Sequence, residues 1–306
     1  MTMESADVTV PENHVLRVMF YNIYGYKWYP DKEHCPHLHS GPVSLRQKME
    51  AELIERYAPD VLGMEEYCAA FHKGMTPLLN QAGYTQVDEW YTEPDQNGNR
   101  INFTPLFYKA DRLRVLRSGY YLYSGPNDVQ SKSLTWTIFE EAEEHKRFIT
   151  VCTHFMYNDP KLTAEEQNRT RVENARQLLT VVDQIEQLDN GQFSGIPVIM
   201  GGDLNCLWGS EPFQTLQDNG FQWLYDIAQT KNDSSGIKQY ATYDELVGEY
   251  ITYPTPVDDP HRAIDHMMIR QGTSSQATVL SYLAVTDREA CLCSDHCPRI
   301  AEMILS

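Results

Sequence analysis

The sequence is short of basic residues. Its 306 residues include 25 Lys and Arg against 43 Asp and Glu, which gives a formal net charge of −18 at pH 7. A surface that neutralises many nucleic-acid phosphates by itself carries clustered Lys and Arg, and no such run is present in the sequence. The composition therefore argues against tight nucleic-acid binding without a metal ion. It suits a protein that holds cations and acts on small or locally bound phosphates.

Long apolar segments are also lacking. No stretch approaches the roughly 20 apolar residues that a membrane-spanning helix needs. The N-terminal segment MTMESADVTVPENH has neither the basic start nor the apolar stretch of a signal peptide. We therefore expect a cytoplasmic protein, although a chain from which a leader had been removed would look the same.

The paired cysteine spacings of structural zinc sites are missing too. Seven cysteines are an odd number and cannot all form disulfides with one another. The clusters around Cys35 and around Cys293 lack the spacing of a zinc site. Cys152 and Cys206 lie beside apolar, strand-like runs, where we expect buried and reduced thiols.

The pattern of apolar runs predicts one α/β domain. No repeat, low-complexity segment or Pro/Gly/Ser linker divides the chain, so we expect residues 1–14 to form an N-terminal extension and residues 15–306 a single domain. Side chains alternate along a strand, so Asp265 and His266 should face opposite sides. Strands are predicted at 15–21, 61–64, 197–200, 264–269, 278–285 and 299–305, with several more between 106 and 151.

Two helices are predicted from apolar periodicity. The first opens at 41–42 and ends before Pro59. Its apolar face should carry Leu45, Met49, Leu53 or Ile54, and Tyr57. The second starts at a capping-box sequence, 163–166, and carries an apolar stripe from 172 to 188.

Polar residues suited to bind a metal ion or a phosphate follow many of the predicted strands. The carboxyl ends of strands are where α/β proteins usually gather their chemistry. A single case would be explained as a turn, because Asp and Asn side chains bond to nearby backbone. Six such strand ends in one chain indicate an active site instead: Asn22, Glu66, His154, Asp203 with Asn205, Asp265, and Asp295 with His296.

These residues lie in motifs that resemble those of the endonuclease/exonuclease/phosphatase superfamily, the deoxyribonuclease-I-like phosphoesterases. VMFYN ends in Asn22, and PDVLGMEEY carries Glu66, with Glu65 in place of the customary Gln. Each motif alone is weak, whereas all of them in order, from residue 15 to the C-terminus, are specific. The later motifs are TH at 153–154, GDLN at 202–205, IDH at 264–266 and SDHCP at 294–298.

The resemblance implies an α/β (α+β) fold, a four-layer sandwich of two packed, mostly antiparallel β-sheets flanked by helices. It also implies a hydrolase of phosphodiesters or phosphomonoesters that depends on Mg²⁺ or Mn²⁺. The expected metal ligands are Asn22, Glu66 and Asp295, because all-oxygen ligation favours these two ions over zinc.

Five further residues are expected to serve the reaction. Asp203 would orient or deprotonate the attacking water, and Asn205 would hold that water or a phosphate oxygen. Asp265 would orient His296, which acts as acid, base or phosphate clamp and whose pKa the carboxylate raises. His154 would donate to transition-state oxygens. Either Asp203 or His296 could be the formal base.

The substrate stays open at this point between a small molecule, a lipid head group and a nucleic acid. The main alternative to a small-ester hydrolase is a metal-dependent nuclease acting on DNA or RNA. A non-catalytic binding protein with the same fold is a third alternative, against which the intact set of motif residues argues. Two aromatic-rich segments, 23–41 and 237–262, could set specificity by stacking on a substrate. The sequence leaves the oligomeric state open.

Overall fold

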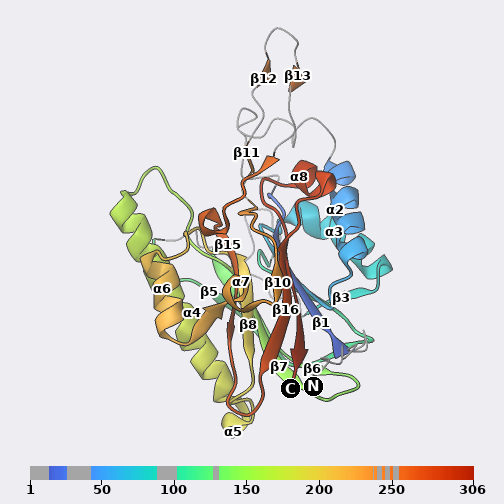
Figure 1. The fold of residues 1–306 in the computed structure, drawn as a ribbon, viewed down its shortest axis with the longest axis vertical. Helices are drawn as coiled ribbons and strands as arrows, with labels where there is room; N and C mark the ends of the chain where they lie inside the picture. Colours follow the sequence, from blue (N-terminus) through green and yellow to red (C-terminus); the bar gives the residue numbers. More distant parts are fainter. Residues whose placement is uncertain are drawn as a thin grey trace, which may run out of the picture.

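Two β-sheets pack face to face and carry helices on their outer sides (Figure 1). The structure, a computed structural model, describes residues 14–25, 43–87, 102–126, 131–236 and 257–306, together with four two-residue strands between 238 and 256. Residues 1–13 and most of the two aromatic-rich segments lie outside this description.

The first sheet combines strands from both ends of the chain. Its central pair, β1 and β2, is parallel, as is the edge pair β10 and β16, while the other neighbours are antiparallel. The seven strands, in sheet order, are β10 (Thr230–Lys231), β16 (Ala277–Ala284), β17 (Arg299–Leu305), β1 (Leu16–Asn22), β2 (Val61–Glu65), β4 (Leu106–Lys109) and β3 (Tyr84–Gln86).

The second sheet is built mainly from the middle of the chain. Only β7 and β8 are parallel, and the other pairs are antiparallel. The six strands, in sheet order, are β5 (Leu113–Leu122), β6 (Ser133–Glu141), β7 (Arg147–His154), β8 (Val198–Asp203), β15 (Asp265–Arg270) and β9 (Phe221–Trp223). Two short hairpin-like pairs join β11 (Lys238–Gln239) to β14 (Thr255–Pro256) and β12 (Tyr243–Asp244) to β13 (Glu249–Tyr250).

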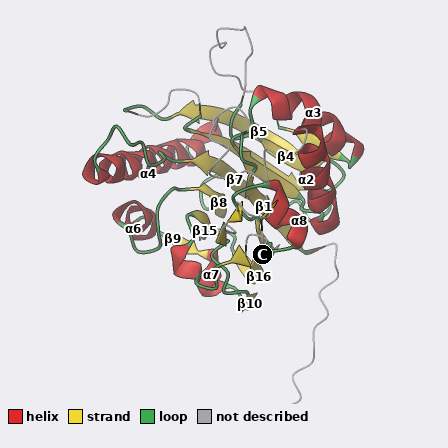
Figure 2. Ribbon diagram, turned by 90° about the horizontal axis from the view of Figure 1, so that it is seen from above, coloured by secondary structure: helices red, strands yellow, loops and turns green. Residues whose placement is uncertain are grey.

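The helices complete four layers, which Figure 2 shows from above. Apolar residues of the first sheet's outer face pack against α2 (Val43–Tyr57), α3 (Ala69–Gln81) and α8 (Arg288–Cys293). On the far side, α4 (Ala164–Glu186) and α6 (Glu211–Asp218) cover the second sheet. A third apolar cluster fills the space between the sheets. The predicted four-layer sandwich is confirmed. The remaining short helices are α5 (Leu188–Gly191), α7 (Leu224–Ile227) and η2 (Pro260–Arg262).

Helix α4 begins as predicted, whereas the buried face of α2 differs from the prediction. The Thr163 side chain accepts a hydrogen bond from the Glu166 amide, and the Glu166 carboxylate accepts one from the Thr163 amide, so the capping box is present. In α2, Leu45 was expected in the core but is 53% exposed. The helix buries Arg46 and Glu50 instead, because Arg46 donates to three backbone carbonyls inside the fold. Within the described residues, no helix is long and apolar enough to cross a membrane.

Candidate active site

Strand register brings the predicted polar residues to one end of the sandwich, although not all of them follow strands as expected: Asp265 begins β15, and Asp295 and His296 follow α8. Pairing of β1 with β2 sets Asn22 beside Glu65. Pairing of β8 with both of its neighbours sets Asp203 between His154 of β7 and Asp265 of β15. All five of these side chains are buried. Side chains alternate between the two faces of a strand. The strands that end in these polar residues therefore also supply apolar residues to the core between the sheets.

One carboxylate oxygen lies at the centre of this group. Oδ2 of Asp203 is 3.2 Å from Nδ2 of Asn22, 3.4 Å from Nε2 of His154 and 3.9 Å from Nε2 of His296. The other oxygen, Oδ1, accepts a hydrogen bond of 2.8 Å from the backbone amide of Asn205. Asp203 is therefore fixed by the backbone on one side and surrounded by nitrogen atoms from three other elements on the other.

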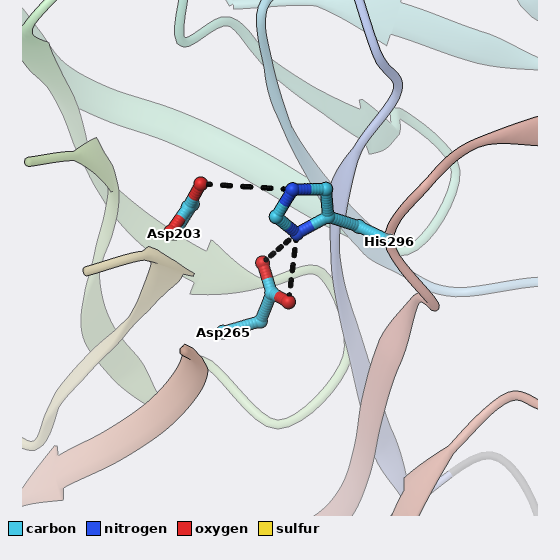
Figure 3. A group of neighbouring side chains, drawn as sticks. All are labelled: Asp203, Asp265 and His296. Atoms are coloured by element: carbon cyan, nitrogen blue, oxygen red, sulfur yellow. Dashed lines mark hydrogen bonds and ion pairs between the residues drawn. The ribbon is translucent and has the colours of Figure 1, made fainter. Parts of the chain in front are cut away.

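His296 faces Asp203 because Asp265 holds the opposite side of its ring (Figure 3). Its Nδ1 lies 2.9 Å from both carboxylate oxygens of Asp265. Its Nε2 is 3.7 Å from Oδ1 of Asp295. The hydroxyl of Ser294 accepts from the His296 amide at 3.1 Å and donates to the carbonyl of Asn22 at 2.7 Å. These two bonds fasten the SDH segment to the end of β1.

The surrounding charges fix the protonation states of the two central groups. Burial by itself would raise the pKa of Asp203, but the basic groups around it, among them His296 and Lys132, outweigh it and hold that pKa below its usual range. Burial would lower the pKa of His296, but the carboxylates of Asp265 and Asp295 raise it well above its ordinary value. Asp203 is thus an ionised acceptor, and His296 is a protonated donor.

The predicted ligands Asn22 and Glu66 lie next to each other. Nδ2 of Asn22 is 3.4 Å from Oε1 of Glu66, whose Oε2 accepts from the Gly25 amide at 2.7 Å. Oδ1 of Asn22 accepts from the Tyr24 amide at 3.0 Å. The nitrogen of Asn22 therefore faces the carboxylates, and the amide group must turn over to present its oxygen to a cation.

The donor set and the charge of the site fit a divalent cation. Glu66 has a φ of 61°, a strained conformation for a residue other than glycine that occurs mostly at functional positions. In the described part of the chain, no Lys or Arg forms an ion pair with Glu66, although this carboxylate is buried. Buried carboxylates are ordinarily paired or bound to a metal. Asp203, Asp265 and His296 also form a group whose potential ligand atoms lie within 4.8 Å of one another.

Glycine is required at position 202 for a steric reason. Its φ is +136°, and a Cβ atom there would lie 2.0 Å from the Thr153 carbonyl oxygen and 2.7 Å from Oε1 of Glu65. That Glu65 oxygen accepts a hydrogen bond of 3.2 Å from the thiol of Cys152. Burial raises the pKa of Glu65 well above its usual value, and Asp265 and Asp203 add to the effect. The Glu that replaces the customary Gln is therefore held in its neutral form.

The structure brings all eight predicted site residues into this region and excludes His266. As expected, His266 faces the opposite side of β15, where its Nε2 donates to the Cys206 carbonyl at 2.8 Å. Lys132, which sequence reasoning missed, lies in the site: its Nζ is 2.6 Å from Nε2 of His154. The sequence signal for it was weak, a single basic residue directly before a strand-like run.

Comparisons with known proteins find relatives by structure and none by sequence. Neither a comparison with models of protein families nor one with curated proteins gives a match. An endonuclease/exonuclease/phosphatase from Bacteroides vulgatus matches with a TM-score of 0.67 and 20% identity, over 95% of this chain and 99% of its own. The chain has the endonuclease/exonuclease/phosphatase fold.

Two other solved structures with the endonuclease/exonuclease/phosphatase fold match over most of their length. The mannosyl-6-phosphatase of Bacteroides thetaiotaomicron has a TM-score of 0.68 and 18% identity, over 94% of this chain and 99% of its own. The human nocturnin catalytic domain, with a bound sulfate anion, has a TM-score of 0.64 and 17% identity, over 95% of each chain. The resemblance read from the motifs is thereby confirmed at the level of the fold.

Proposed function

We propose that the chain is a metal-dependent hydrolase of phosphate esters, with residues 15–306 acting as one catalytic domain. The observation that carries the proposal is the environment of Asp203. This ionised carboxylate faces the protonated ring of His296, with 3.9 Å between Oδ2 and Nε2. A carboxylate acceptor beside an imidazolium donor can hold a water on one side of a phosphate and bind a phosphate oxygen on the other. Structural relatives that include a mannosyl-6-phosphatase support the same reaction class.

Mg²⁺ or Mn²⁺ would be held by Glu66 and Asn22, with Asp295 in direct contact or through water. When bound, the ion would neutralise charge on the phosphate and stabilise the leaving oxygen. The oxygen-rich donor set supports these two ions over zinc, which more often takes nitrogen and sulfur ligands.

The protein's own residues divide the remaining work. Asp203 orients the attacking water as a hydrogen-bond acceptor, since its lowered pKa keeps it ionised. His296 donates from Nε2 to a phosphate or leaving-group oxygen, since its raised pKa keeps it protonated. Asp265 fixes the donor nitrogen by holding Nδ1. Asn205, anchored by its bond to the Phe155 carbonyl, would position the water or a phosphate oxygen.

Small phosphate esters suit the charge of the protein better than nucleic acid. The chain carries a net charge of −18. Two arginines near the site are already engaged, Arg46 with backbone carbonyls and Arg171 with the Met156 carbonyl and with Asn158. A nuclease would need free cations along the backbone of its substrate.

A substrate panel tests the proposal. The purified chain is assayed with Mg²⁺, Mn²⁺ or EDTA against sugar phosphates, inositol phosphates, sphingomyelin, single- and double-stranded DNA, and RNA. We expect metal-dependent release of product from at least one small ester, and loss of that activity in Asp203→Asn but not in the exposed control Asp111→Asn. Hydrolysis confined to DNA or RNA would favour the nuclease. Absence of hydrolysis across the panel, with both metals, would refute the proposal.

A further inference from the structure

A buried lysine lies against the second histidine of the site. Lys132 directly precedes β6 and is 3% exposed. Its Nζ is 2.6 Å from Nε2 of His154, and that nitrogen is 3.4 Å from Oδ2 of Asp203. Lysine is almost never fully buried without a partner. This one is directed at His154, a neighbour of the carboxylate proposed to act on the attacking water.

The contact decides which nitrogen of His154 carries a hydrogen. A protonated lysine can only donate, so Nε2 of His154 must accept, and the ring is neutral with its hydrogen on Nδ1. Burial and the charge of Lys132 both lower the pKa of His154, which favours the same neutral ring. With Nε2 engaged as an acceptor at 2.6 Å, the donor on this side of the site is the ammonium group of Lys132.

The ammonium group also lies close to an exposed surface. Nζ of Lys132 is 5.3 Å from the ring centroid of Tyr157, and Tyr157 is 38% exposed. The ammonium group of Lys132 is therefore near both the buried His154 ring and a residue that solvent reaches.

We propose that Lys132 binds the phosphoryl group of the substrate in this site and makes the site prefer phosphomonoesters over phosphodiesters. The inference rests on the proposed function. A monoester presents three terminal oxygens and about two negative charges at neutral pH, whereas a diester presents two such oxygens and one charge. The site is rich in carboxylates: Glu66, Asp203, Asp265 and Asp295. Without a fixed cation besides the metal and His296, these would repel a dianion more strongly than a monoanion.

Orthophosphate binding and a matched pair of esters test the inference. Lys132→Met is compared with the wild type and with Lys146→Met, a partly buried lysine in the β6–β7 turn whose Nζ donates to the Leu305 carbonyl. Orthophosphate affinity is measured by calorimetry in Mg²⁺. The kcat/KM values are measured for 4-nitrophenyl phosphate and bis(4-nitrophenyl) phosphate. Lys132→Gln repeats the series if the Met variant does not fold.

We expect orthophosphate to bind the Lys132 variant at least about tenfold more weakly, as for the loss of a charged hydrogen bond. The monoester kcat/KM should fall by a similar factor and the diester value by less. Unchanged orthophosphate affinity in a folded Lys132 variant, or no orthophosphate binding by the wild type, would overturn the inference. An equal fall for both esters would overturn the monoester preference. If no ester is hydrolysed but the Lys132 variant loses orthophosphate, the proposed function fails and the phosphate site stands.

Discussion

Nδ1 of His296 lies 2.9 Å from both carboxylate oxygens of Asp265, a residue 31 positions earlier in the chain. Asp265 begins β15 in one sheet, and His296 precedes β17 in the other, so the contact joins the two halves of the sandwich at the site. The motifs predicted this contact, and the structure confirms it. A ring held at Nδ1 can present only Nε2 to a substrate, and that nitrogen faces Asp203.

Asp265→Asn should lower kcat by at least about tenfold while leaving the Mg²⁺ requirement almost unchanged, because tautomer control is lost and no proposed ligand is touched. Asp265 raises the pKa of His296. The alkaline fall in kcat/KM, where His296 loses its proton, should therefore move to lower pH in the variant. A pH series and a Mg²⁺ titration check both expectations. Asp218→Asn, on the exposed end of α6, is the control, and normal turnover in Asp265→Asn would exclude the proposed pair.

Metal removal is the second prediction. EDTA should abolish hydrolysis, and Mg²⁺ or Mn²⁺ should restore it, because Glu66 and Asn22 offer oxygen ligands to a hard cation. Glu66→Gln removes one charge from the ligand set and should raise the metal concentration needed for half-maximal activity by about tenfold or more. The readouts are a metal titration of activity and calorimetry of Mn²⁺ binding. Full activity in excess EDTA would contradict the metal mechanism.

The third prediction separates catalysis from stability. Asp203→Asn and His296→Ala should each lower kcat by about a hundredfold or more, because each removes a group that serves the transition state. Thermal unfolding of each variant shows whether the fold is kept. His72→Ala, on α3 and outside the site, controls for loss of a histidine. A folded variant with near-normal turnover would show that the residue has a different role.

Much of the fold and the site could be predicted because the signal is local. The strand at 299–305 was predicted with the observed bounds of β17, and the capping box of α4 follows from adjacent residues. The site residues were found because each stands in a short motif. What brings them together is strand register, such as His154 opposite Asp203, and register depends on pairings between distant segments. The register could be predicted from the sequence only through the resemblance to a known family.

The predictions that failed have a common physical cause: charged side chains are buried inside the fold. Periodicity placed Leu45 in the core, but α2 turns Arg46 inward, where its guanidinium binds the carbonyls of Ile23, Tyr24 and Cys293. Lys132 escaped notice for the same reason, since a lone lysine before a strand is usually solvated. Both cations are buried because the fold supplies acceptors that no sequence pattern displays.

The last prediction concerns the pH dependence of folding through His266. This ring is buried, its Nε2 donates to the Cys206 carbonyl, and its Nδ1 has no hydrogen-bond partner among the described residues. Burial lowers its pKa from 6.5 to about 4. The unfolded chain therefore takes up a proton near pH 6.5, whereas the folded chain does so only near pH 4. The contribution of the neutral His266 ring to the free energy of unfolding is therefore fully present above pH 6.5. It is lost progressively as the pH falls toward 4, by about 1.4 kcal/mol per pH unit and roughly 3 kcal/mol in total.

Urea unfolding of the wild type and of His266→Gln between pH 7 and pH 4 measures this contribution. Gln keeps a donor for the Cys206 carbonyl but has no titratable group. The variant should be less stable than the wild type at pH 7, because the ring's contacts with Phe213 and Trp223 are lost. Its free energy of unfolding should nevertheless decline less steeply with falling pH. The two slopes should differ by up to about 1.4 kcal/mol per pH unit, the value for the uptake of one proton. His72→Gln, outside the core, is the control. Parallel pH profiles for wild type and His266→Gln would show that the buried ring does not resist protonation.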